Sequence, residues 1–261
     1  RLGRDYVPTF WNLTVFDPFG TNGVGTVVGF KAKTTTAAGV PLGLVAGTAV
    51  AANDPHAVRS DNMVQYFLPP NLGGFYGQAS YAFDESATNN AGRYYGLRAG
   101  YGAGPFNVAV AFGKTTGANP PTGAVPDVKT WNIGGQWDFG MAKLLAQFDD
   151  NRYNASTVNA TLKSWLIGGL IPVGAGEIRL SYSDAKLSDT GANTPRADQW
   201  AIGYVHNLSK RTALYATYAR VNNKDGSALP IQASLPQATG APAGIAGNSS
   251  SGFDLGIRHS F

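Results

Sequence analysis

Apolar and polar residues alternate along most of the chain after residue 60. Within residues 131–139 the large apolar side chains occupy odd positions, whereas Asn, Gly, Gln and Asp occupy the even positions. A period of two indicates a β-strand with one apolar face and one polar face. The same reading of the whole chain predicts eleven strands, near residues 61–69, 73–84, 92–101, 105–114, 128–139, 141–153, 160–171, 176–186, 197–207, 210–222 and 252–261.

The connections between these predicted strands alternate in length. Short connections fall at residues 69–72, 102–104, 140, 172–175 and 208–209. Long connections, rich in Gly, Pro, Ser, Thr and Asn, fall at residues 85–91, 115–127, 154–159, 187–196 and 223–251. All tight turns would then lie at one end of an antiparallel meander, as in outer-membrane β-barrels. A water-soluble sandwich or barrel is the alternative, but it has no physical reason to sort its loops in this way.

The composition supports a membrane barrel. Only 14% of the residues are charged, against about 25% in average soluble domains, yet the mean hydropathy is slightly negative at −0.12. No apolar run reaches the roughly 20 residues that a spanning helix needs. The predicted strands have the length of a tilted bilayer crossing. The sequence therefore predicts an all-β protein, a transmembrane antiparallel up-and-down β-barrel.

Several other classes of protein are disfavoured. The chain has no Cys, which excludes disulfide scaffolds and thiolate metal sites. Its 20 Lys and Arg residues are scattered, which argues against a nucleic-acid partner. The three His residues lack metal-ligand spacing, and no Gly-x-Ser-x-Gly motif occurs. We therefore expect no enzyme, no catalytic residues, no metal site and no cofactor. The alternatives are an adhesin or structural barrel with binding loops, and an outer-membrane barrel enzyme.

Three stretches of the chain resemble Gram-negative porins of the general, β-proteobacterial type. Residues 253–261, FDLGIRHSF, are similar to the closing strand of these porins, which ends in an aromatic residue. Residues 2–6, LGRDY, followed by residues 17–20, DPFG, look like the end of the fifth strand entering the constriction loop. Residues 59–66, RSDNMVQY, look like the entry into the sixth strand.

The resemblance covers the whole chain and implies its organisation. General porins have sixteen strands, so the chain would hold about eleven of them, strands 6–16. Residues 1–261 would form a single barrel domain lacking its N-terminal strands. Residues 5–58 would be an inward-folded constriction loop, and residues 223–251 a long external loop. A smaller barrel is the alternative, in which residues 10–58 supply further strands, for example at residues 26–32.

The resemblance also assigns candidate pore residues. Asp17 matches an acidic residue of the constriction loop, and Arg59 matches a basic wall residue just after it; Arg4 and Asp61 join this constriction. The odd and even positions of the predicted strand support the assignment, because Arg59, Asp61 and Gln65 fall on the face opposite the apolar Val64 and Tyr66. The pore-lining residues expected from parity are Gln65, Gln78, Arg98, Gln136, Glu177, Arg179 and Arg258.

The implied function is a passive diffusion channel for small hydrophilic solutes and ions across the bacterial outer membrane. The net charge of +4 weakly favours anions. The resemblance implies a homotrimer in contact with lipid and lipopolysaccharide. It also implies that Phe261 is the assembly signal that the barrel-assembly machinery reads.

Overall fold

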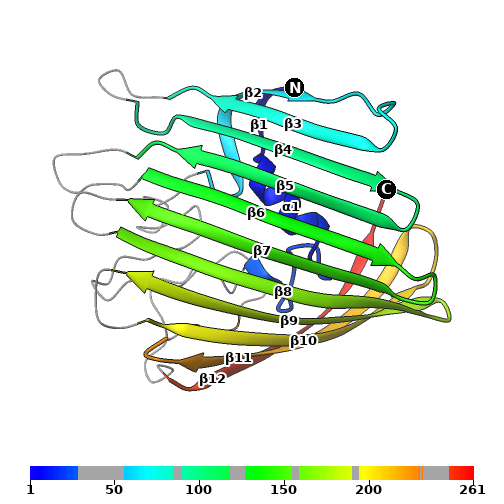
Figure 1. Cartoon of the computed structure of the whole chain (residues 1–261). Helices are drawn as coiled ribbons and strands as arrows, with labels where there is room; N and C mark the ends of the chain where they lie inside the picture. The colour runs from blue at the N-terminus through cyan, green and yellow to red at the C-terminus, as the bar shows by residue number, and fades with distance from the viewer. Residues whose placement is uncertain are drawn as a thin grey trace.

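The protein forms a single curved, antiparallel β-sheet. The computed structural model describes residues 1–28, 56–84, 90–117, 127–154, 159–189, 194–227, 229, 231 and 247–261. The sheet has 12 strands, which pair in sequence order from β1 to β12 (Figure 1). The strands are β1 (Leu2–Tyr6), β2 (Arg59–Phe67), β3 (Phe75–Ala82), β4 (Tyr94–Ala103), β5 (Phe106–Thr115), β6 (Asp127–Asp138), β7 (Lys143–Asn154), β8 (Asn159–Val173), β9 (Gly176–Asp189), β10 (Arg196–Asn207), β11 (Thr212–Lys224) and β12 (Ser249–His259).

The eleven predicted strands correspond to β2–β12, and the all-β up-and-down topology is confirmed. The additional strand, β1, is the segment that the resemblance identified as the end of a preceding strand. β1 and β12 are the two edges of the sheet. The helix α1 (Pro8–Val15) follows β1 and lies on the concave side of the sheet, behind the strands in Figure 1. The alternative strand at residues 26–32 falls largely outside the described residues.

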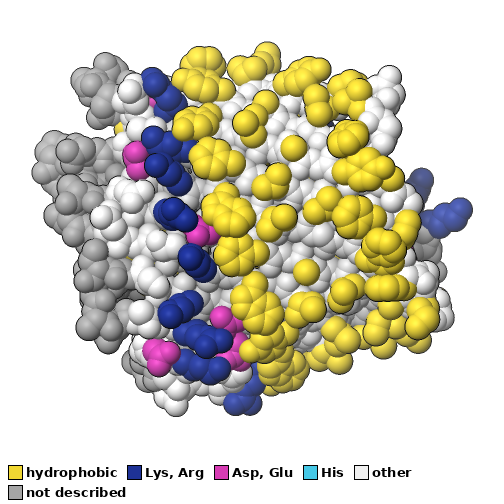
Figure 2. Space-filling view, viewed as in Figure 1, with side chains coloured by type: hydrophobic (Ala, Val, Ile, Leu, Met, Phe, Trp, Pro, Cys, Tyr) yellow, Lys and Arg dark blue, Asp and Glu magenta, His cyan; other side chains and the backbone are white. Residues whose placement is uncertain are grey.

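The convex face of the sheet is apolar. Side chains such as Val110, Ile133 and Ile202 are between two-fifths and half exposed there, and Figure 2 shows apolar side chains spread across this face. Large aromatic rings pair between neighbouring strands, as in Trp165 with Tyr182, whose ring centroids are 5.5 Å apart. The apolar outside and more polar inside explain how the chain combines low charge with a near-neutral hydropathy. No helix in the described part of the chain is long and apolar enough to cross a membrane.

The connections at one end of the strands are tight. Gly104 (φ 56°) and Gly174 (φ 58°) close the β4–β5 and β8–β9 turns, where a left-handed backbone conformation favours glycine. The opposite end carries the longer connections, among them residues 7–58 between β1 and β2 and residues 225–248 between β11 and β12. The β7–β8 connection, residues 155–158, is no longer than the turn at 208–211, so the predicted contrast in loop length is weakest there.

Candidate functional site

The segment that follows β1 folds back against the inner face of the sheet. Pro8 occupies the first turn of α1, where its fixed φ suits a helix start. Asn12 Nδ2 donates a hydrogen bond to the carbonyl oxygen of Ala109 at 3.1 Å. Asn132 Nδ2 donates to the carbonyl oxygen of Thr9 at 3.0 Å. These buried amides attach the helix to β5 and β6.

The side chains that follow α1 pack against glycines on the inner face of the sheet. A Cβ atom at Gly134 of β6 would lie 2.2 Å from Phe16, and one at Gly168 of β8 would lie 2.4 Å from Pro18. At Gly203 of β10 a Cβ atom would lie 2.9 Å from the ring of Phe19. The loop therefore crosses the inner face of the sheet and contacts every second strand at a glycine. At these positions the missing side chain leaves the space that the loop residue fills.

The far end of the loop is held on β10 and β12. Gln199 Nε2 donates hydrogen bonds to the carbonyl oxygens of Gly25 and Thr26, both at 3.2 Å. The backbone N–H of Val24 donates to Asp254 Oδ2 at 2.9 Å. Sequence reasoning missed Gln199, Asp254 and the glycines as loop contacts. The sequence gives little indication of these contacts. Each of these residues is only a polar residue or a glycine on the inner side of a strand with alternating faces.

Asp17 is buried within the loop. Its carboxylate accepts hydrogen bonds from the backbone N–H groups of Phe19 (2.9 Å), Thr21 (3.3 Å) and Val27 (3.3 Å) and from the Thr26 hydroxyl (3.3 Å). Burial raises the pKa of the Asp17 carboxyl above its ordinary value, although these hydrogen bonds oppose the shift. The residue was predicted to present negative charge at a constriction. Its carboxylate instead faces the backbone of its own loop.

Arg4, Arg59 and Asp61 gather at the junction of β1 and β2. Arg4 Nη1 lies 2.8 Å from Asp61 Oδ2. The Arg59 guanidinium lies 4.4 Å from the centroid of the Tyr6 ring and donates a hydrogen bond to its hydroxyl at 2.6 Å. Both members of the Arg4–Asp61 pair are more than half exposed, so this pair is accessible to solvent.

The alternation in β2 breaks between this cluster and the rest of the strand. Asn62 has a φ of 49°, and the pairing with β1 shifts register at this point. As a result Ser60 and Met63 are both buried, with two exposed residues between them. The parity that put Arg59 and Asp61 on the face of Gln65 is therefore wrong, because a bulge inserts one extra residue.

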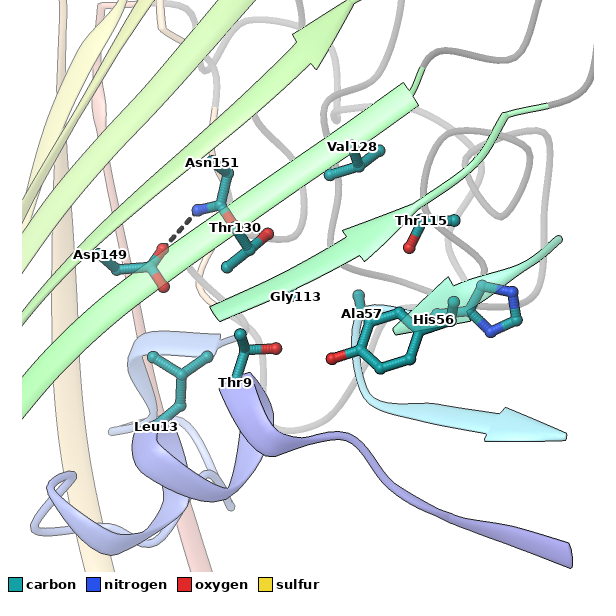
Figure 3. Close-up of a pocket in the computed structure, with 11 residues that line it drawn as sticks. Thr9, Leu13, His56, Ala57, Gly113, Thr115, Val128, Thr130, Asp149 and Asn151 are labelled. Atoms are coloured by element: carbon teal, nitrogen blue, oxygen red, sulfur yellow. Dashed lines mark hydrogen bonds between the residues drawn. The ribbon is translucent and has the colours of Figure 1, made fainter. Parts of the chain in front are cut away.

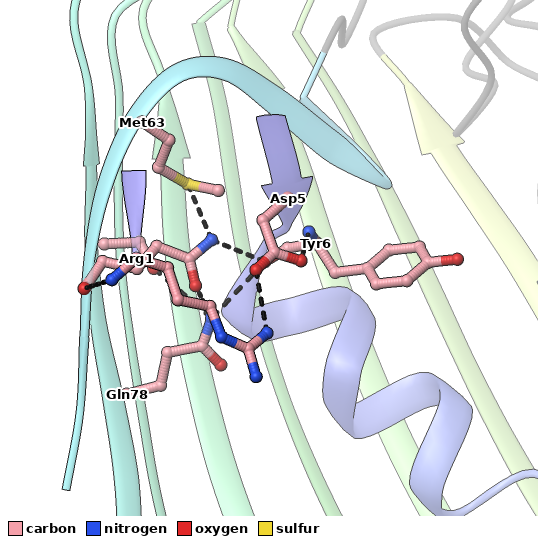
Figure 4. Close-up of polar contacts among 7 residues, drawn as sticks. Arg1, Asp5, Tyr6, Met63 and Gln78 are labelled. Carbon is pink, nitrogen blue, oxygen red and sulfur yellow. Dashed lines mark hydrogen bonds and ion pairs between the residues drawn. The ribbon is translucent and has the colours of Figure 1, made fainter. Parts of the chain in front are cut away.

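Gln65 and Gln78 are buried at the start of the loop. Gln78 Nε2 donates a hydrogen bond to Gln65 Oε1 at 2.8 Å, and Gln65 Nε2 donates to the carbonyl oxygen of Tyr6 at 3.0 Å. An Arg1–Asp5 ion pair at 3.0 Å lies beside them (Figure 4). These two glutamines, predicted as pore-lining residues, hold the end of β1 in place.

The other predicted pore-lining residues lie on the inner face at different heights. Arg98 donates a hydrogen bond to Asn12 of α1, and its guanidinium lies 4.9 Å from the Tyr76 ring centroid. Gln136 pairs across β5–β6 with Asn107 near the short-turn end. Phe261, the predicted assembly signal, is fully exposed beyond β12.

An open cavity lies between the loop tip and strands β9–β12. It measures about 330 Å³ and is lined by Phe19 and Asn22 of the loop and by Arg179 and Arg258 of the wall. Arg179 Nε lies 3.0 Å from Glu177 Oε1. The cavity thus brings two of the predicted arginines to one space and leaves Arg258 largely exposed to solvent.

A second cavity behind α1 is too small for a substrate. Its volume is about 10 Å³, roughly that of one water molecule. Thr9 of the helix and Thr130, Asp149 and Asn151 of the wall line it, and Asn151 donates a hydrogen bond to Asp149 (Figure 3). Within the described ranges, no group of three or more His, Asp or Glu residues could hold a metal ion.

Comparisons with known proteins agree with this architecture. The family model described as Gram-negative porin matches residues 1–226. Outer membrane porin protein 32 of Delftia acidovorans is 36% identical over 268 aligned residues, which cover 100% of this chain and 70% of that protein. Among solved structures, the anion-selective porin from Comamonas acidovorans matches with a TM-score of 0.80 and 34% identity, over 100% of this chain and 74% of that one. A trimer form of OmpT of Vibrio cholerae matches with a TM-score of 0.65 at 14% identity, over 99% and 75% of the respective chains, a likeness of fold alone.

Proposed function

The chain belongs to the Gram-negative porin family, and from this premise we propose that its inner face lines a passive, anion-preferring diffusion channel for small hydrophilic solutes and ions. Porins are channels of the outer membrane. Membership of this family therefore gives the location of the protein and the kind of transport that we propose for it. The loop occupies part of the space on the concave side of the sheet and so narrows the lumen that we propose there. This narrowing is the single observation that carries the proposal, since a general diffusion pore needs a lumen with one restricted section.

The distribution of charge on the inner face supports an anion preference. Acidic side chains there are already engaged: Asp149 is buried among amide groups, Asp254 accepts a hydrogen bond from the loop backbone, and Glu177 forms an ion pair with Arg179, which leaves Arg258 as the excess positive charge. Arg179 and Arg258 line the open cavity instead. Ions in transit would therefore meet more positive than negative charge. Exposed charges within a Debye length of about 8 Å act on them without strong screening.

The Arg4–Arg59–Asp61 cluster holds two guanidinium groups and one carboxylate; Arg4 pairs with Asp61, and Arg59 contacts Tyr6. Because the bulge at Asn62 turns Arg59 and Asp61 away from the face of Gln65, we propose this cluster as a basic rim at the sheet edge rather than as part of the pore wall. We assign Asp17 to loop stability, because its carboxylate is occupied by backbone donors. The family resemblance places acidic and basic side chains opposite each other across the pore. The proposed arrangement differs, because the Asp17 carboxylate faces the backbone of its own loop and not the lumen.

The open sheet requires further strands in the working channel. Unpaired N–H and C=O groups at the β1 and β12 edges could not be satisfied by lipid. We propose that further antiparallel strands between these edges close the barrel, to the total of sixteen that the resemblance to general porins implies. OmpT has been solved in a trimer form, and a homotrimer is the proposed assembly here. The exposed Phe261 is the proposed signal for the barrel-assembly machinery.

The test is the ion selectivity of a double variant. Arg179→Gln with Arg258→Gln removes two positive charges from the cavity and should shift the reversal potential in a salt gradient toward cation preference. Lys129→Gln with Lys186→Gln removes the same charge from the outer face and should leave that potential unchanged. Equal reversal potentials for the two double variants would contradict the proposed role of the cavity arginines.

A further inference from the structure

The open cavity beside the loop tip has two aromatic walls. Phe19 of the loop lies over β10, where a Cβ atom at Gly203 would be 2.9 Å from its ring. Tyr215 of β11 lies over β12, where a Cβ atom at Gly256 would be 2.7 Å from Cε1 of its ring. Both aromatic residues line the cavity. Two rings therefore flank one space on the inner face, each over a glycine whose missing side chain leaves it room.

The strand register sets the distance between these two walls. Gly203 pairs with Thr217 across β10–β11, and Tyr215 pairs with Gly256 across β11–β12. Gly203 and Gly256 are thus two strands apart, which is roughly 10 Å at about 4.8 Å per strand. Two carbon–carbon contacts of roughly 3.5–4.0 Å each fit within this separation. One flat ring of a solute can therefore lie between Phe19 and Tyr215.

The two arginines of the cavity differ in their partners. Arg179 Nε lies 3.0 Å from Glu177 Oε1, so the charge of this arginine is balanced within the wall. Arg258 is exposed, and within the described ranges no ion pair joins it to a carboxylate. Asp254 is bound by the Val24 N–H and does not line the cavity. Among the lining residues Arg258 thus carries the one unbalanced charge, which a single carboxylate on a solute would neutralise.

The cavity lies on the short-turn side of the loop tip. Arg258 pairs with Ala213 near the start of β11, whereas the loop tip is held further along the wall, at Gly203 and Asp254. The cavity is open, so a solute bound there would exchange with the lumen. A solute that moves along the inner face past the loop tip therefore reaches the two rings and Arg258 together.

The lining has more apolar surface than an inorganic anion can use. Chloride is stabilised by positive charge and by water, and it gains nothing from contact with an apolar wall. Here Phe19, Val205 and Ala213 line the cavity beside the arginines. Sites for small organic molecules combine such an apolar lining with a few polar groups that fix the orientation of the ligand. The composition of the cavity therefore fits an organic anion.

We propose that this cavity binds aromatic monocarboxylates as they pass through the channel. The ring of the solute packs between Phe19 and Tyr215, in the offset or edge-on contacts that aromatic rings prefer. Its carboxylate accepts paired hydrogen bonds from the Arg258 guanidinium, whose planar fork matches the two oxygens. This inference rests on the proposed function, because it names the class of solute that the anion-preferring lumen would retain.

Isothermal titration calorimetry of the purified protein in detergent tests the site with three probes. Benzoate has the ring and the charge, benzamide has the ring without the charge, and acetate has the charge without the ring. The cavity variants are Arg258→Gln and Tyr215→Leu. Arg211→Gln is the matched control for charge, since Arg211 is exposed at the β10–β11 turn and does not line the cavity. Tyr76→Leu is the matched control for the ring, since Tyr76 lies over Gly100 of β4.

Benzoate should bind the unsubstituted protein more tightly than benzamide or acetate does. Arg258→Gln should weaken benzoate binding roughly tenfold or more, as expected for hydrogen bonds to a charged group, and should remove the preference for benzoate over benzamide. Tyr215→Leu should weaken it about two- to tenfold and leave acetate binding unchanged. Both control variants should bind benzoate as the unsubstituted protein does. Equal affinity for benzoate and acetate, or equal losses in the cavity and control variants, would overturn the proposal.

Planar-bilayer recordings separate this site from the channel itself, because calorimetric binding does not require an open pore. A protein that conducts chloride and does not bind benzoate would overturn the site and leave the diffusion channel standing. A protein that binds benzoate with the expected pattern of variants and does not conduct would support the site and overturn the channel. In a conducting protein, benzoate should interrupt the single-channel current briefly, and Arg258→Gln should shorten these interruptions.

Discussion

A single methyl group at Gly134 should displace the inner loop. The Cβ atom of Gly134→Ala would lie 2.2 Å from Cδ2, 2.6 Å from Cγ and 3.0 Å from Cβ of Phe16. Ordinary contacts begin near 3.4 Å, so Phe16 must move by roughly 1 Å for the methyl group to fit. Phe16 is fully buried and cannot rotate into open space. The loop itself must therefore move away from β6 and toward the lumen.

The expected free energy follows from overpacking. Inserting a methyl group into a close-packed site costs about 1–3 kcal/mol. Replacing a glycine by alanine at an unobstructed position gains about 0.4–1 kcal/mol through the unfolded state. Gly135 provides this reference, because its Cβ atom would meet only Asn107 O at 3.6 Å and Val108 Cγ2 at 3.9 Å. Gly134→Ala and Gly135→Ala should therefore differ in unfolding free energy by roughly 2–3 kcal/mol.

Two assays check this difference. Urea unfolding in detergent gives the stability of each variant, and single-channel recording gives its conductance. Gly134→Ala should be the less stable of the two and should conduct less, because the loop moves into the pore. Adding Phe16→Ala to Gly134→Ala should restore the conductance in part, since the smaller side chain makes room for the methyl group. Indistinguishable stability and conductance for Gly134→Ala and Gly135→Ala would refute the docking of Phe16 on that glycine.

Three further predictions concern the same loop. Phe16→Ala alone should lower the unfolding free energy by about 3–5 kcal/mol in urea titrations, because the ring is fully buried; a loss below about 1 kcal/mol would mean that the ring contributes little packing. Asp254→Ala should cost about 1–3 kcal/mol and increase open-channel noise, because it leaves the Val24 N–H without its acceptor; an unchanged current trace would argue that this contact does not hold the loop tip. Since burial raises the pKa of Asp17, the folded loop binds a proton more tightly than the unfolded chain does, so stability should rise as the pH falls from about 7 through the raised pKa. Thermal midpoints measured across that range should show the rise, and Asp17→Asn should remove it.

The wall of the protein could be predicted from sequence because strand alternation is local. Eleven strands follow from a period of two, and the membrane-facing side follows from which phase is apolar. The docking of the loop could not be predicted, because Phe16 and Gly134 are far apart in sequence and a glycine gives no sign of what occupies its place. Parity failed at Asn62 because one residue in the left-handed region inserts a bulge and reverses the faces of Arg59 and Asp61.

Asp17 illustrates a different limit. The resemblance located it on the inward-folded loop, but a family motif does not state the direction of a side chain. Three backbone N–H groups converge on its carboxylate, and these donors are arranged by turns within the loop. The cations on the outer face show the opposite case: they are visible as scattered charges in the sequence, and only the strand register places Lys114 opposite Lys129 and Lys163 opposite Lys186.

The selectivity of the channel in a planar bilayer tests the central claim most directly. With a potassium chloride gradient across the bilayer, the protein should insert with ohmic, stepwise conductance in multiples of three, and the sign of the reversal potential should correspond to chloride passing more readily than potassium. A protein that inserts without conducting would contradict the proposed channel. A conducting protein whose reversal potential corresponds to potassium passing more readily would contradict the role given to the inner-face arginines.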